Sequence, residues 1–293
     1  MNPATTPNWL FGKTLSAIAG KFTFRKIPDW PIWRGEGLVI PALQESGLAV
    51  LVKFFSKPSS NRVVRLAQLH RLNLSAADEW LFKAMPIGWG QATLDDNQVY
   101  DYSVLPHLGI AHSAMRLDAW IAQSPEKKAL RIRKALVCEL WCIVQHLERR
   151  GLRHCDLSQQ NLMVTVGPDD VPWLNLIDVE NICGTGIDPI PADERILGAH
   201  GYQYPALRDG KVTEVQTDRF AAAVLSCEIM TAYVLEQVHG AESLFEIQAC
   251  EAPIPYALRQ VWPAGFALLD RAIHAPQPAH MPAPAEWIRA VLG

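Results

Sequence analysis

Residues 154–164 have the sequence HCDLSQQNLMV, and this stretch decides the fold. It follows a long run of helical periodicity, residues 127–150, that stops at Gly151, a residue type that favours helix ends. It leads directly into LMVTV, a short apolar run of the kind that forms a strand. Asp156 and Asn161 therefore stand at the two ends of a tight loop between a helix and a strand.

A second carboxylate follows another short apolar run. The sequence LNLIDVEN, residues 174–181, places Asp178 directly after a predicted strand. A carboxylate at a strand end can chelate a magnesium ion that also binds phosphate oxygens. Taken alone, Asp178 could equally cap a turn, and Asn161 could be an ordinary turn residue. The interpretation as a metal site depends on their occurrence together.

The first third of the chain is predicted to be rich in strands. Branched and aromatic residues fill 38–43 and 48–55, and a turn separates the two runs. Helices are expected over 62–72 and over 76–85, and two further strands follow them. Lys53 lies in the second run, among neighbours too apolar for an ordinary surface strand. Gly35 and Gly37 precede the first run, although any tight turn uses glycine.

Helices dominate after about residue 109. Helical patterns cover most of the chain from residue 217 onward and end with a helix over 285–292. Residues 1–28 form a leader in which 8–19 have helical spacing. That helix is expected to dock on the main domain, with a membrane or partner contact as the alternative. The sequence therefore predicts an α+β protein, with strands first and helices after.

The composition favours a globular protein of a reducing compartment. The 293 residues are 49% hydrophobic and 19% charged, and the net charge of -3 offers no field for nucleic acid. No apolar stretch approaches the roughly 20 residues that span a bilayer, and no signal peptide is predicted. The six cysteines show no CxxC spacing, so we expect free thiols and a cytoplasmic location.

In this order, the motifs of residues 29–293 resemble the catalytic domain of the protein-kinase-like superfamily. The resemblance implies a bilobal fold, with a small strand-rich N-lobe at 29–109 and a larger helical C-lobe at 110–293. GAHGYQYPAL, residues 198–207, is similar to the end of an activation segment. Within the superfamily, the motifs GEG, HCDLS and LIDVEN most resemble bacterial serine/threonine kinases encoded beside von Willebrand A-domain proteins and a metal-dependent protein phosphatase.

The resemblance also implies roles for individual residues. Asp156 would accept or orient the proton of the attacking hydroxyl, Asn161 and Asp178 would bind Mg2+ or Mn2+, and Lys53 would contact the phosphates of ATP. The residues implied in nucleotide binding besides Lys53 are Gly35, Gly37, Val39, Leu105, His107 and Met163. The residues implied in holding the site together are His154, Asp218 and Gln68.

Several positions depart from the family pattern. Cys155 replaces an arginine that reads a phosphorylated activation loop, and Ser158 replaces a lysine that neutralises the transferred phosphate. Gln68 stands where a glutamate usually pairs with the lysine, and Glu79 is the other candidate partner of Lys53.

Three functions therefore remain open. The first is a protein kinase acting on a protein substrate, with a von Willebrand A-domain protein or a phosphatase as possible partner. The second is a pseudokinase that binds nucleotide or a protein partner. The third is a small-molecule kinase for a sugar or antibiotic.

Overall fold

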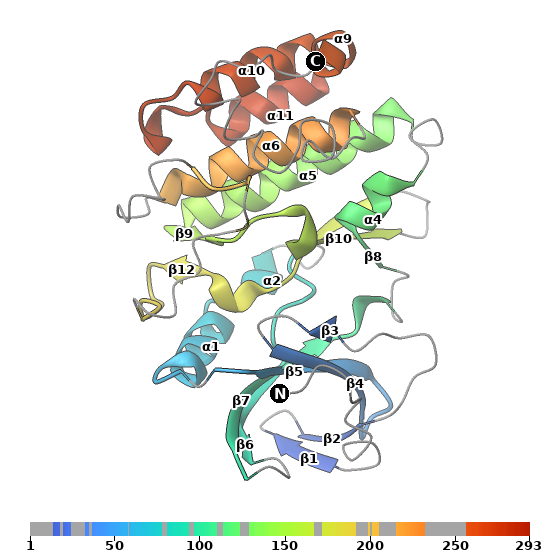
Figure 1. Cartoon of the computed structure of the whole chain (residues 1–293), viewed down its shortest axis with the longest axis vertical. Helices are drawn as coiled ribbons and strands as arrows, with labels where there is room; N and C mark the ends of the chain where they lie inside the picture. Colours follow the sequence, from blue (N-terminus) through green and yellow to red (C-terminus); the bar gives the residue numbers. More distant parts are fainter. Residues whose placement is uncertain are drawn as a thin grey trace. The chain divides into compact units, whose positions relative to one another are not determined.

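A computed structural model describes residues 14–17, 20–24, 33–34, 37–57, 59–77, 81–93, 97–109, 114–123, 129–166, 172–191, 199, 201–204, 215–231 and 256–293. The chain is a mixed α+β protein, as predicted, and divides into two compact units (Figure 1). The first unit comprises residues 1–113 and 186–194, and the second comprises residues 114–185 and 195–293.

An antiparallel sheet forms the body of the first unit. Its strands follow the order β1-β2-β4-β5-β7-β6, and β3 pairs with β4 outside this path. Their bounds are Thr14–Ala17 for β1, Gly20–Phe24 for β2, Trp33–Arg34 for β3, Gly37–Gln44 for β4, Ala49–Phe55 for β5, Gly88–Thr93 for β6 and Val99–Pro106 for β7. The first and last strands, β1 and β6, also contact each other, so the sheet is curled.

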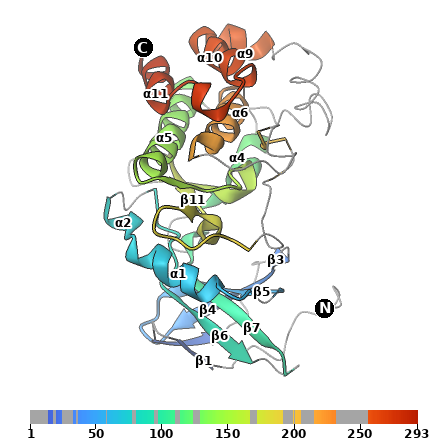
Figure 2. The ribbon, with the colours of Figure 1, turned by 90° about the vertical axis from the view of Figure 1, so that its left-hand side faces the viewer.

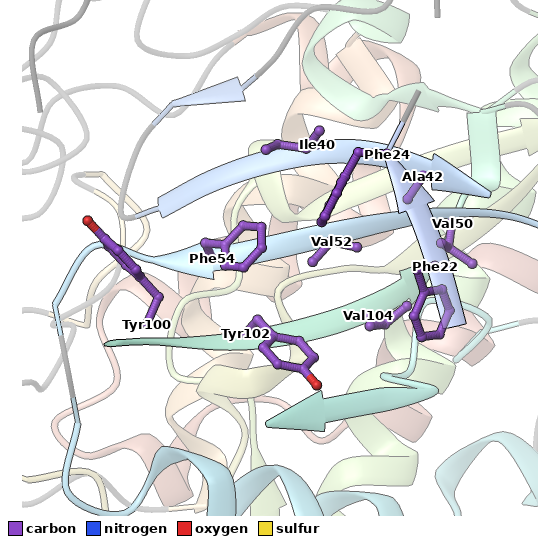
Figure 3. Packing of buried hydrophobic residues seen from close by; sticks show 10 residues of the cluster. All are labelled: Phe22, Phe24, Ile40, Ala42, Val50, Val52, Phe54, Tyr100, Tyr102 and Val104. Carbon is purple, nitrogen blue, oxygen red and sulfur yellow. The ribbon is translucent and has the colours of Figure 1, made fainter. Parts of the chain in front are cut away.

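One face of this sheet carries the hydrophobic core (Figure 3). Alternate residues of four strands point into it, as the two-residue period of a strand requires. The buried residues are Phe22, Phe24, Ile40, Ala42, Val50, Val52, Phe54, Tyr100, Tyr102 and Val104. The remaining side chains of these strands therefore lie on the opposite face of the sheet.

Helix α1, Arg62–Arg71, packs beside β6 and β7 (Figure 2). The ring of His70 lies 4.9 Å from that of Trp89 on β6. Asp101 on β7 is buried and accepts hydrogen bonds from Arg62, from Gln91 and from a backbone N–H. A short helix, α2 at Leu74–Ala77, follows. The predicted helix over 62–72 and the two later strands are confirmed. The helix expected over 76–85 was wrong where it can be compared, because α2 ends at Ala77 and residues 81–84 form turns, while 78–80 lie outside the described residues.

The second unit is built around helices α5, Leu130–Arg149, and α6, Asp218–Thr231. Figure 1 shows them side by side, and α11 packs on α5 while α10 packs on α6. Trp141 of α5 stacks on Trp287 of α11 at 4.7 Å and donates a hydrogen bond to Ser226 of α6. The other helices of the unit are α4 at Leu117–Ala122, α9 at Tyr256–Val261, α10 at Pro263–Ile273 and α11 at Pro284–Leu292.

Short strands follow α5 and carry the residues singled out in the sequence. Strand β10, Leu162–Val166, pairs with β11, Pro172–Leu176, and also with β8, Met115–Arg116. Strand β9, Leu152–Arg153, pairs with β12, Cys183–Gly184. Helix α5 ends at Arg149, and Gly151, just beyond its C-cap residue Arg150, has a φ of 68°, so the expected glycine stop is confirmed.

The prediction for the leader was wrong where it can be compared. Residues Thr14–Ala17 form strand β1 and pair with β2, and the rest of the expected helix over 8–19 lies outside the described residues. Leu15 packs against the core of the sheet, so tertiary burial outweighs the local helical spacing. In the described part of the chain, no helix is long and apolar enough to cross a membrane.

Candidate active site

The loop between β9 and β10 is closed by Asn161. Its amide nitrogen Nδ2 donates hydrogen bonds to the backbone oxygen of Asp156 at 2.7 Å and to the carboxylate Oδ2 of Asp156 at 2.8 Å. A single 3-10 turn, Gln159–Asn161, brings the two residues together. Because the nitrogen is used for Asp156, the side-chain oxygen of Asn161 is the atom that can bind a cation.

Helix α6 anchors the start of this loop through Asp218. Its carboxylate accepts hydrogen bonds from the backbone N–H of His154 at 2.5 Å and of Cys155 at 3.1 Å. Asp218 is only 4% exposed. Burial raises the pKa of its carboxyl group, while His154 and the two backbone donors lower it. Asp218 therefore accepts two hydrogen bonds from the loop that carries Asp156.

The register of β10 and β11 brings Asp178 to the same loop. Leu162 pairs with Leu176, and the ladder continues with a hydrogen bond from Ile177 N–H to the Asn161 carbonyl at 2.9 Å. The fully buried ring of His154 fixes the chain just before Asp178, because its Nε2 donates a hydrogen bond to the carbonyl oxygen of Ile177 at 3.0 Å. Asp178 follows Ile177 directly, so it leaves the strand next to Asn161.

Burial and the neighbouring carboxylate of Asp178 both raise the pKa of Asp156. Burial is the largest cause that raises the pKa of its carboxyl group, and the charge of Asp178 raises it further. His154, the hydrogen bond from Asn161 and a backbone hydrogen bond from Ala199 lower it. The net shift is upward, and it moves a carboxylate toward the range in which a general base works best near neutral pH.

Two residues of the site have left-handed backbone conformations. Four described non-glycine residues have positive φ, and two of these are asparagines, which tolerate it. The others are Cys155 with a φ of 68° and Asp178 with a φ of 54°. Such conformations cost energy and cluster at functional sites. Cys155 directly precedes Asp156, and the other residue is Asp178 itself. Aspartate tolerates this conformation as asparagine does, so Cys155 is the position that adds to the case for a site here.

The protein could supply two ligands to a metal ion, Asp178 and the side-chain oxygen of Asn161. Among the described residues, no three His, Cys, Asp or Glu side chains gather to hold a metal by themselves. Magnesium suits this arrangement, because it commonly takes one or two protein oxygens and fills its other positions with phosphate oxygens and water.

Val39, Lys53 and Leu105, which are expected to contact nucleotide, share one face of the sheet with Leu51. Val39 pairs directly with Lys53, and Leu51 pairs with Leu105 on the next strand. All four alternate with core residues, so they lie on the face opposite the hydrophobic core. Lys53 is nevertheless only 5% exposed, and its Nζ lies 5.3 Å from the ring centre of Phe55.

Gly37 is required by a close approach of two strands. A Cβ at this position would lie 2.2 Å from the backbone oxygen of Phe54. Gly35, the other glycine of the motif, lies outside the described residues. Steric crowding thus explains Gly37 without reference to a ligand.

The two other residues expected at the nucleotide lie one in each unit. His107 is buried, its N–H donates to the Ala49 carbonyl at 3.2 Å, and burial lowers its pKa to about 4. Its backbone donor therefore serves the sheet, and its ring is neutral at pH 7. Met163 lies on β10, one residue beyond the ladder pair of Leu162 and Leu176, and pairs with Asn175.

Gln68 lies on α1 but does not have the expected partner. Its side-chain oxygen accepts a hydrogen bond from the backbone N–H of Asp188 at 2.8 Å, where the sequence suggested Lys53. Arg65 and Asn61, on the same side of the helix, donate to the backbone oxygens of Asp188 at 3.2 Å and of Pro189 at 3.0 Å. The amide of Gln68 is drawn to this chain segment instead. The alternative partner, Glu79, lies outside the described residues.

Sequence reasoning missed this attachment of residues 188–189 to α1. The spacing of Asn61, Arg65 and Gln68, by four and three residues, places them on one helix face. That pattern could have indicated a polar binding face. It could not have indicated a partner more than one hundred residues away in the chain.

The amino-acid sequence matches no model of a known protein family, and no match is found among the curated proteins.

Proposed function

We propose that the chain is an ATP-dependent phosphotransferase of the protein-kinase-like superfamily that transfers the γ-phosphoryl group to a protein hydroxyl. One observation carries the proposal: Asp156, Asn161 and Asp178 converge on one loop that a buried carboxylate, Asp218, anchors from a separate helix. The spacing of Asp156 and Asn161 in the sequence already indicated a site. The hydrogen bonds between them explain the spacing, because five residues bring the Asn161 amide back to the Asp156 carboxylate.

The proposed reaction gives each residue one task. The Asp156 carboxylate accepts the proton of the substrate hydroxyl as its oxygen attacks the γ-phosphorus, and the bond to the bridging oxygen of ADP breaks. Asn161 holds the Asp156 carboxylate in position through the 2.8 Å hydrogen bond. Bound magnesium, with Asp178 and Asn161 as protein ligands, would neutralise charge on the phosphates.

Lys53 would supply a positive charge to the phosphates in the same reaction. Its position opposite Val39, on the face of the sheet away from the core, supports this role. Ser158, which is buried, contributes no charge where related kinases have a lysine, so we expect slow turnover.

A pseudokinase is the second candidate, and Gln68 favours it. The helix position that usually holds the phosphate-binding lysine through an ion pair carries a neutral side chain bound to Asp188. A protein of this kind would bind nucleotide or a protein partner without transferring phosphate.

Labelled ATP distinguishes these functions. The purified chain is incubated with Mg2+ and γ-labelled ATP, alone, with general protein substrates and with sugar and aminoglycoside acceptors. The proposal predicts label on protein that is lost in Asp156→Ala and in Asp178→Ala. Label on a small hydroxyl compound alone would identify a small-molecule kinase. ATP binding without any transfer would support the pseudokinase.

A further inference from the structure

Two cysteines meet beside the proposed base. The sulfur of Cys155 lies 2.7 Å from the sulfur of Cys183, and both are free thiols. Cys183 lies on β12, which pairs with β9 through Arg153, and the left-handed turn at Cys155 folds the chain back toward it. The register of a two-stranded pair therefore places the thiols together, although they are far apart in sequence.

We propose that Cys155 and Cys183 form a site of reversible oxidation, which a peroxide converts into an intramolecular disulfide. A disulfide requires a sulfur separation of about 2.05 Å, so the thiols need a shift of well under 1 Å. The other described cysteines do not reach this pair: Cys138 and Cys142 interact on α5, and Cys227 is buried in α6.

The chemistry balances with hydrogen peroxide as the oxidant. The Cys155 thiol loses its proton and its sulfur attacks one peroxide oxygen. The O–O bond breaks, the departing hydroxide takes up the proton as water, and a sulfenic acid remains. The neighbouring Cys183 thiol and burial raise the pKa of Cys155, so we expect this first step to be slow. The sulfur of Cys183, 7% exposed, then displaces the hydroxyl group as a second water. Two thiols lose two electrons and two protons, and the peroxide is reduced to two waters.

Oxidation would act on the proposed active site. Cys155 precedes Asp156 in the chain, and Cys183 follows Asp178 after a single turn, so the bond would link the segments that carry both carboxylates. A displacement of about 1 Å in a catalytic group can lower a rate about 100-fold. We therefore expect peroxide to lower phosphotransfer at least tenfold, an expectation that depends on the proposed function.

The direct test is a peptide map of the whole protein. Trypsin leaves both cysteines, and no other, in the peptide of residues 154–195, because no Lys or Arg lies between His154 and Arg195. After peroxide and blocking of free thiols, this peptide should lack two hydrogen atoms and carry no block. A further chymotryptic cut after Trp173 should leave its halves joined until dithiothreitol is added. Free, blockable thiols at both positions after peroxide would overturn the proposal.

Variants give the control. In Cys183→Ser, peroxide should leave a sulfenic acid on Cys155 that dimedone traps, and the disulfide should be absent. Cys142→Ser, on α5, should respond to peroxide as the wild type does. Oxidation of Cys155 to the sulfinic acid while Cys183 stays a thiol would contradict the proposal.

Activity is measured on the same samples. Lost transfer that dithiothreitol restores supports the switch, and a disulfide that leaves transfer unchanged overturns it. If the reduced protein transfers no phosphate, the proposed function fails, while the peptide map still decides the disulfide.

Discussion

Replacing Asp218 by alanine should loosen the loop that carries Asp156. The carboxylate accepts two backbone hydrogen bonds, a buried one from His154 and a partly buried one from Cys155. Hydrogen bonds to a charged group contribute about 1.5–3 kcal/mol each. Burial raises the pKa of Asp218, which shows that its charge is costly to keep away from water. The alanine variant no longer carries this cost, and this offsets part of the loss. We expect a net loss of about 3 kcal/mol, or a fall of roughly 6–12 °C in melting temperature for a unit of this size.

Amide hydrogen exchange locates the effect. A loss of about 3 kcal/mol corresponds to exchange roughly 100-fold faster at the amides of His154 and Cys155. Asp218→Asn keeps one acceptor and should lose about half as much stability. Asp270→Ala, an exposed aspartate on α10, is the control and should change stability by less than about 0.5 kcal/mol. Unchanged exchange at both amides in Asp218→Ala would refute the anchoring role.

Three further predictions follow from burial and packing. Burial raises the pKa of the Asp156 carboxyl group, so the folded protein binds this proton more tightly than the unfolded chain does. Protonation of Asp156 therefore stabilises the fold at low pH, and this contribution to the free energy of unfolding is lost as the pH rises through the folded pKa. In calorimetry at pH 7, Asp156→Asn should therefore be at least as stable as the wild type, and any gain in stability should shrink toward pH 4. The variant should lose phosphotransfer. A clear destabilisation of Asp156→Asn at pH 7 would contradict this prediction. Burial lowers the pKa of His107 to about 4, so between pH 6.5 and 4 the unfolded chain takes up a proton at this residue more readily than the folded protein. The free energy of unfolding should therefore fall by up to about 3 kcal/mol over this range. His107→Gln should remove this pH dependence in urea titrations. Gly37→Ala should lower the melting temperature, because its Cβ would lie 2.2 Å from the Phe54 backbone oxygen. Gly293→Ala, whose Cβ would lie 3.4 Å from the Arg289 carbonyl oxygen, should leave it nearly unchanged, and equal losses would argue against the crowding.

Local pattern predicted much of the first unit. The runs at 38–43 and 48–55 became β4 and β5, and the helix expected at 62–72 became α1. The apolar neighbours of Lys53 indicated that this is no ordinary surface strand, and Lys53 is indeed buried on β5. These features depend on residues close in sequence.

Features that depend on distant pairing were harder to predict. The helical spacing of the leader gave no indication that residues 14–17 pair with β2. The side of α1 that carries Gln68 follows from its spacing, but its attachment to Asp188 does not.

The candidate site shows the same division. The tight loop from Asp156 to Asn161 was expected from spacing, and the anchor at Asp218 was expected only through resemblance to a family. The missing CxxC spacing predicted free thiols, and nothing in it indicated the contact of Cys155 with Cys183, which comes from the pairing of β9 with β12.

Calorimetric titration with ATP tests the central claim, a magnesium-nucleotide site that includes Asp178 and Asn161. The account predicts that the wild type binds ATP more tightly with Mg2+ than without, and that Asp178→Asn loses most of this difference. Asp156→Asn, which keeps a side-chain acceptor for Asn161, should bind Mg-ATP nearly as the wild type does. Equal Mg2+ dependence in the wild type and Asp178→Asn would contradict the account.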